Sequence, residues 1–207
     1  MESIDMVENA LAVITGLAWT VAYLGIIHRG FRDKTYGMPL TALALNITWE
    51  FIFAFLVPGR FGLQVAINVV WFCFDVVILY TYFAFGRKEF PASVHQRWFI
   101  PWGVLLVAIS FVTQYSAARE FPDLPMDTYT AFVVNVIMSV AFITMLARRG
   151  SRAGQSLVIA TSKWLGSAAV TVLVFLDLGS SLLLTLGVCV FVLDVIYIVM
   201  LARTRAA

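Results

Sequence analysis

The chain has 207 residues, of which 61% are hydrophobic and only 13% are charged, and its mean hydropathy is +0.92. These values exclude a soluble globular protein and indicate a chain that lies in a lipid bilayer. The formal net charge of +2 gives no reason to expect a nucleic-acid partner.

Long apolar segments recur along the whole chain. Each has about 17 to 23 residues, which is enough for an α-helix to cross about 30 Å of hydrocarbon. The acidic N-terminus lacks a basic region, so we expect the first segment to stay in the mature protein. The sequence therefore predicts one all-α integral membrane domain over 1–207 with seven transmembrane helices. They lie near 9–28, 38–57, 63–85, 98–116, 128–147, 156–176 and 180–202.

Basic residues gather after every second apolar segment. Lys and Arg in short loops are retained in the cytoplasm, so these loops indicate the orientation. Only Arg60 and Arg119 fall on the other side. We therefore expect the N-terminus outside and the C-terminus in the cytoplasm, in a bacterial cytoplasmic membrane or an ER membrane. The residues that predict this are Arg29, Arg32, Lys34, Arg87, Lys88, Arg97, Arg148, Arg149, Arg152, Arg203 and Arg205.

Two short motifs occur twice. HRGFR at 28–32 is similar to RRGSR at 148–152, and FDVVI at 74–78 is similar to LDVIY at 193–197. Both pairs are offset by about 120 residues, which matches segments one to three with five to seven and leaves the fourth as a link. An odd number of linking helices leaves both halves in the same orientation. The pattern predicts a parallel 3+1+3 repeat with the functional cavity between the halves near the membrane midplane.

Three acids lie inside predicted spans, namely Glu50, Asp75 and Asp194. A carboxylate in the membrane costs several kcal/mol and must face protein or a wet cavity, so each is a candidate functional residue. Asn46 and Glu50 are four residues apart, so they share a helix face and the amide can hydrogen-bond the carboxyl.

The third segment carries one polar and aromatic stripe, because its members step by four, three and four residues. The stripe consists of Gln64, Asn68, Trp71 and Asp75. We expect a functional role for Glu50 and Asp194, because an ionisable group is a costly way to make a helix contact. Supporting residues around them are Asp75, Asn46 and Asn68, and the lining can extend to Asn135, Ser139 and Tyr197.

Each of these residues also has a purely structural interpretation. Polar side chains in spans can simply join helices through hydrogen bonds. Lys163 either snorkels from the start of the sixth span towards the cytoplasm or pairs with an acid. Most aromatic residues are expected to face lipid, whereas Trp49 and Trp71 have polar neighbours and are better candidates for a cavity.

Several familiar chemistries lack their usual residues. The chain has no DDxxD or NDxxD cluster to hold magnesium and diphosphate, so we expect no metal and no other cofactor. The seventh segment has no lysine for a retinal Schiff base. His28 and His95 lie in predicted loops, and Cys73 and Cys189 lie in separate segments, which excludes the common nucleophilic sets and any cysteine pairing pattern.

Two stretches carry a family resemblance: YGMPLTALALNITWEF at 36–51 and VLDVIY at 192–197. Together with seven predicted spans, they resemble the small integral-membrane terpene cyclases of fungal meroterpenoid and indole-diterpene pathways and their bacterial relatives acting on prenylated alkaloids. The resemblance implies that Glu50 and Asp194 are the essential acids. It also implies metal-free cyclisation of a linear isoprenoid tail, often bearing a terminal epoxide, on an aromatic or heterocyclic head group.

A buried carboxyl suits this reaction, because apolar surroundings disfavour its ionised form and leave it able to donate a proton. Either Glu50 or Asp194 would protonate the epoxide or alkene while the other orients it, in an intramolecular lyase or isomerase type of reaction. Aromatic faces would stabilise the migrating cation by about 0.5 to 2 kcal/mol each. The candidates are Trp49, Trp71, Phe53 and Tyr197.

The implied partners are a lipophilic prenylated substrate that arrives from the membrane lipid, and a pathway prenyltransferase and epoxidase. The alternative is a small-molecule or proton-coupled transporter with a polar site at the midplane, because buried acids also serve as proton relays. A third interpretation is a subunit that only scaffolds a partner protein.

Overall fold

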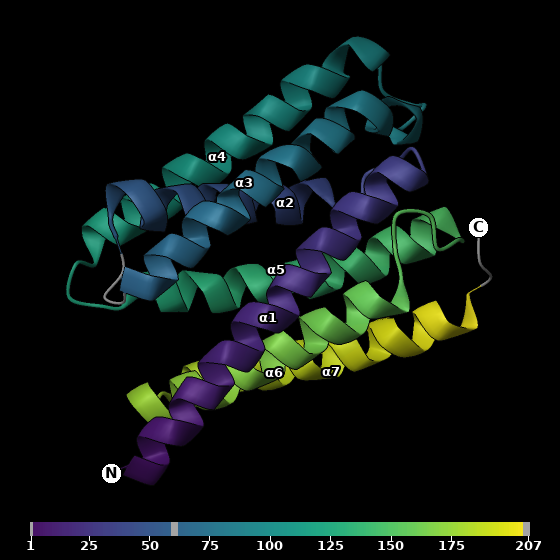
Figure 1. The fold of residues 1–207 in the computed structure, drawn as a ribbon. Coiled ribbons are helices and arrows are strands. Elements are labelled where there is room, and N and C mark those ends of the chain that lie inside the picture. Colours follow the sequence, from purple (N-terminus) through teal and green to yellow (C-terminus); the bar gives the residue numbers. More distant parts are fainter. Residues whose placement is uncertain (1, 59–61, 205–207) are drawn as a thin grey trace.

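The computed structural model describes residues 2–58 and 62–204, which form α-helices and no strand (Figure 1). A π-helical turn, Ile52–Leu56, continues α2, and short 3₁₀ turns lie at Gly86–Glu89 and Gln96–Trp98. Arg60 and Arg205, which contributed to the predicted orientation, lie outside the described residues. The α-helices are α1 (Glu2–Arg32), α2 (Leu40–Phe51), α3 (Gly62–Phe85), α4 (Phe99–Glu120), α5 (Met126–Arg149), α6 (Leu157–Leu178) and α7 (Ser181–Arg203).

The prediction of an all-α integral membrane protein is confirmed by the lengths and apolar surfaces of the helices. Six of the described helices, α1 and α3 to α7, are long and apolar enough to cross a bilayer. The segment Leu40–Leu56 is apolar but shorter. Large apolar side chains such as Leu17, Val112 and Val188 are more than half exposed, as expected of surfaces that contact lipid. The count of seven spans and the orientation remain predictions.

Local sequence signals set the ends of the C-terminal helices. Gly150 and Gly179 end α5 and α6 with φ of 60° and 59°, a left-handed conformation that glycine adopts without a Cβ clash. Ser156 and Ser180 precede α6 and α7, and the Ser156 side chain accepts a hydrogen bond from the Ile159 amide at 3.2 Å. Short connections therefore place α6 antiparallel to α5 and α7 antiparallel to α6.

The helices pack in two groups that α1 and α5 join. Helix α1 packs on α3 and on α6, and α7 packs on α5 and α6. Helix α2 packs on α3, α4 and α5. In Figure 1, α2, α3 and α4 lie on one side, α6 and α7 lie on the other, and α1 crosses between them. One buried apolar cluster, with Met38, Phe142 and Leu201 among its members, extends through both groups.

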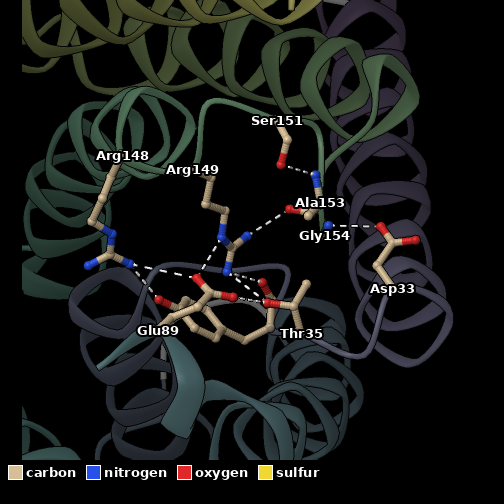
Figure 2. Close-up of polar contacts among 9 residues, drawn as sticks. Asp33, Thr35, Glu89, Arg148, Arg149, Ser151, Ala153 and Gly154 are labelled. Atoms are coloured by element: carbon tan, nitrogen blue, oxygen red, sulfur yellow. Dashed lines mark hydrogen bonds and ion pairs between the residues drawn. The ribbon is translucent and has the colours of Figure 1, made fainter. Parts of the chain in front are cut away.

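A polar network closes the end of the molecule where α1, α5 and α7 terminate (Figure 2). The nearly buried Arg149 side chain donates to Glu89 Oε2 at 2.7 Å, Ala153 O at 2.8 Å and Tyr36 O at 3.0 Å. It also donates to Thr35 Oγ1 at 3.1 Å, and Thr35 in turn donates to Glu89. Burial raises the pKa of Tyr36, and Glu89 acts in the same direction. We call these contacts the basic-end network.

The same end is held by contacts between the two loops that precede α2 and α6. The Gly154 amide donates to Asp33 Oδ2 at 2.8 Å, as Figure 2 shows, and Arg29 pairs with Asp33 at 3.0 Å. Arg148 donates to the Tyr36 hydroxyl at 2.6 Å. The loops therefore pack on each other, and no loose segment separates them.

Candidate active site

Two of the predicted acids lie together between α2 and α3. Glu50 and Asp75 are 1% and 0% exposed. Asn46 Nδ2 lies 2.8 Å from Asp75 Oδ2 and 3.0 Å from Glu50 Oε1, so one amide bridges both carboxyls. Tyr23 on α1 donates its hydroxyl hydrogen to Glu50 Oε1 and accepts from Asn46 Nδ2 at 2.6 Å. We call Glu50 and Asp75 the acid pair.

The acid pair has no cationic partner among residues 2–58 and 62–204, because no ion pair there involves either carboxyl. Each acid also keeps one oxygen, Glu50 Oε2 or Asp75 Oδ1, that is buried without a hydrogen-bond partner. Two carboxyls this close in a dry site cannot both carry a charge easily, so they tend to share a proton. A buried polar atom without a partner is costly unless a ligand or water binds it.

Aromatic rings surround the acid pair on the α1 side. The Tyr23 ring stacks on Trp71 with centroids 5.7 Å apart and lies 5.9 Å from Phe74 and 6.3 Å from Trp19. Trp71 Nε1 donates to Thr20 Oγ1 at 3.2 Å, which fixes the ring. Of the aromatic residues that the sequence suggested for a cavity, Trp71 is therefore the one that packs on Tyr23, whose hydroxyl bonds to Glu50.

The third predicted acid, Asp194, belongs to a different cluster. Lys163 Nζ lies 2.8 Å from both carboxylate oxygens of Asp194 and 2.8 Å from Ser139 Oγ. Both partners are fully buried, at 2% and 1% exposure. Of the two interpretations of Lys163, the structure shows pairing with an acid rather than snorkelling. We call Lys163 and Asp194 the ion pair.

The side chains of the remaining predicted residues contact neither the acid pair nor the ion pair in the hydrogen bonds of the described residues. Trp49 Nε1 donates to Asp127 O at 2.9 Å, and its ring lies 5.4 Å from Phe53, in a small cluster next to α4 and α5. The Tyr197 hydroxyl donates to Gln155 Oε1 at 2.9 Å. Asn68 is buried and accepts from Gln64 at 2.7 Å. Asn135 Nδ2 donates to Ser167 at 2.9 Å.

Two important partners were not predicted from the sequence. Tyr23 was absent from the candidates because a single tyrosine in an apolar helix usually lies at a membrane interface. Its four-residue spacing from Trp19, which puts both rings on one helix face, was the available signal. Lys163 was noticed, but its partner could not be chosen from spacing alone.

An apolar groove of about 420 Å³ lies between α2, α3 and α4. Its lining includes Ile47, which is three residues before Glu50, and Phe72 and Leu79, which are three before and four after Asp75. Residues at these spacings are neighbours on a helix surface, so parts of the groove wall lie one helical turn from Glu50 and Asp75, although neither acid lines the groove. Its other lining residues are Thr48, Phe51, Phe83, Val104, Val107, Ala108 and Phe111.

Comparison with known families decides between the interpretations left open by the sequence. The family model of the Pyr4-like transmembrane terpene cyclases matches residues 1–207. The chain belongs to this family. Membership confirms the resemblance seen at 36–51 and 192–197 and favours the cyclase over the transporter.

Individual members of the family show the same relationship. The chain is 32% identical over 168 residues to a Pyr4-family terpene cyclase of Annulohypoxylon moriforme, covering 78% of this chain and 67% of that protein. It is 26% identical over 175 residues to the asnovolin H synthase of Aspergillus novofumigatus, covering 84% and 72%. It is 29% identical over 154 residues to the terpene cyclase pyr4 of Aspergillus fumigatus, covering 73% and 64%.

Proposed function

We propose that this chain cyclises a linear prenyl tail, attached to an aromatic or heterocyclic head group, by protonation and without a metal. The acid pair is the observation that carries this proposal. It is buried, it forms no ion pair among the described residues, and each acid has one oxygen without a partner. Such a centre can deliver a proton to a substrate in a site that excludes water.

Glu50 is the proposed donor. Its Oε1 already accepts from Tyr23 and Asn46, so a transferable proton belongs on Oε2. After transfer, the same two donors stabilise the new carboxylate, and hydrogen bonds to a charged group contribute about 1.5 to 3 kcal/mol. An epoxide oxygen accepts a proton from a carboxylic acid more readily than an alkene carbon, which favours an epoxidised tail.

Trp71 and Tyr23 are the proposed stabilisers of the first carbocation, because Trp71 stacks on Tyr23 and the Tyr23 hydroxyl is bonded to Glu50. Such contacts contribute about 0.5 to 2 kcal/mol each. Trp49, Phe53 and Tyr197, also proposed from the sequence, would act only on later positions along the tail, because their side chains contact other clusters.

Asp194 has a different proposed role from the shared proton donation expected from the sequence. Both of its oxygens accept hydrogen bonds from Lys163 Nζ, so neither is left without a partner for a substrate. Its function is then to neutralise and hold Lys163 within the apolar interior.

The groove between α2, α3 and α4 is the proposed approach of the prenyl tail from the lipid, because its walls are apolar and include residues one helical turn from Glu50 and Asp75. Val104→Trp would narrow the groove and raise KM several-fold. Leu105→Trp, on a neighbour that is outside the groove and also about half exposed, is the control. Equal KM values for the two variants would exclude this approach.

The proposed topology is seven spans in a parallel 3+1+3 repeat with the N-terminus outside. In this repeat α1, α2 and α3 correspond to α5, α6 and α7. Helix α3 packs on α1 and α2, and α7 packs in the same way on α5 and α6. The contact of α1 with α6 matches that of α5 with α2. Membrane-impermeant labelling of cysteines introduced at 117–127 and at 148–155 checks the orientation. We expect only the first region to be labelled, and labelling of the second region alone would show the opposite orientation.

The reaction needs partners that supply its substrate. A prenyltransferase would attach the tail and an epoxidase would add the terminal oxygen, and both products would stay in the membrane, either bacterial cytoplasmic or ER. These partners are proposals that follow from the chemistry of the substrate.

Purified protein in lipid nanodiscs, given a farnesylated phenol with a terminal epoxide and then the matching alkene, tests the function. We expect a cyclised product of unchanged mass in the presence of excess chelator. The Glu50→Gln variant should form no cyclised product. The Glu120→Gln variant, with the same change at an exposed acid, should still form it. Uptake into vesicles without a new product, or turnover that requires added magnesium, would contradict the proposal.

A further inference from the structure

Cyclisation that begins with a proton must also end with one. The donor's O–H bond breaks as the new O–H bond forms on the epoxide, and carbon–carbon bonds then form in sequence. The last cation becomes neutral by losing a proton from a neighbouring C–H bond, which leaves an alkene. If no base accepts that proton, water adds to the cation instead, the resulting protonated alcohol loses a proton to a second water, and an alcohol results.

We propose that Asp75 is the base that accepts this terminal proton. The inference rests on the function proposed above and adds a second catalytic residue to it. Asp75 Oδ2 is held by Asn46 at 2.8 Å, while Oδ1 is buried without a hydrogen-bond partner and keeps its lone pairs available. The side chain is 0% exposed, so a carboxylate there is not hydrated.

The acid pair can supply both the proton donor and the terminal base. Asn46 Nδ2 touches both Glu50 Oε1 and Asp75 Oδ2, which places these oxygens within about 5.8 Å of each other. Because two such carboxyls share a proton, the resting pair holds one acid and one base. Glu50 gives its proton at the start and Asp75 gains one at the end, so the pair as a whole is unchanged. Return of that proton to Glu50 readies the site for the next substrate.

Outside the acid pair, no buried acid among the described residues has a carboxyl oxygen without a partner. Asp194 has both oxygens occupied by Lys163, and its proton-accepting lone pairs face the ammonium. Glu89 is bound by Arg149 and Thr35 in the basic-end network, next to the loops.

The test compares products as well as rates in nanodiscs with the epoxidised probe, in water labelled with oxygen-18. Asp75→Asn and Asp75→Leu, which cannot accept the proton, should turn over about 10²-fold more slowly. Their main product should be the alcohol carrying the label. Asp75→Glu keeps a base and should still form mainly the alkene.

If either base-free variant accumulates in membranes and makes the wild-type alkene at a similar rate, Asp75 is not the base. The proposed function would still stand in that case if Glu50→Gln remained inactive. A wild-type protein that makes no cyclised product from either probe would overturn both.

Discussion

The acid pair and the ion pair each contain an aspartate, and different residues bind the two aspartates. Between α2 and α3, Asp75 is bound by the neutral amide of Asn46, whereas between α6 and α7, Asp194 is bound by the ammonium of Lys163. The Asn46 amide binds one oxygen of Asp75 and leaves Oδ1 without a partner. Lys163 Nζ donates to both oxygens of Asp194. Two buried acids in one molecule therefore have different chemistry because of the residue opposite each one.

The two clusters occupy corresponding places in the proposed repeat, which makes the comparison informative. Asn46 and Lys163 lie on α2 and α6, and Asp75 and Asp194 lie on α3 and α7. The depth of an acid in the membrane does not distinguish a proton donor from a charge that holds helices together. The residue that binds the acid makes this distinction.

Giving the acid pair a cation is the most severe test of this difference. Asn46→Lys places an ammonium next to Glu50 and Asp75 and should keep them ionised. We expect the initial rate of cyclisation to fall by about 10²-fold or more, since the general acid is lost. Asn46→Met, of similar length without charge, is the control and should lose less. A rate for Asn46→Lys close to wild type would show that the pair need not be free of cations.

Removing the cation from the ion pair should act on stability. Lys163→Met leaves Asp194 buried without a partner, and the free energy of unfolding should fall by about 3 to 5 kcal/mol. Lys163→Met combined with Asp194→Leu should recover most of this loss and retain cyclisation. Denaturant unfolding in detergent and product formation measure the two effects. A double variant that is folded but inactive would show that Asp194 takes part in the chemistry.

A smaller effect should follow from Tyr23→Phe, which removes one donor from Glu50 Oε1 and keeps the ring on Trp71. One hydrogen bond of about 1.4 kcal/mol corresponds to about tenfold in rate, and we expect kcat to fall by that factor. The lipid-exposed Tyr80→Phe is the matched control and should leave kcat unchanged. Loss of folding in Tyr23→Phe rather than of rate would mark the residue as structural.

Contacts within one helix were predictable from the sequence. The four-residue spacing of Asn46 and Glu50 predicted a hydrogen bond, and the two side chains are bonded at 3.0 Å. Contacts between helices were not predictable. Tyr23 is 27 residues from Glu50 and Lys163 is 31 from Asp194, and helix periodicity does not define which faces of two distant helices meet.

The π-helical turn at Ile52–Leu56 was also not predicted. Neither proline nor glycine occurs in this segment, so no local signal marks the change in helical repeat. Phe53 and Ile52 pack there against α4, which indicates that tertiary contacts decide it.

The sequence by itself determined that this chain is a helical membrane protein, because hydrocarbon requires backbone groups to bond within each segment and apolar side chains to face outwards. It also determined that polar residues such as Glu50, Asp75 and Asp194 must turn inwards, since lipid does not solvate them. Only the tertiary structure decided that the Asn46 amide binds Asp75 and that Lys163 binds Asp194. That choice depends on the rotation and pairing of whole helices, where the cost of burying each charge is set by neighbours remote in sequence.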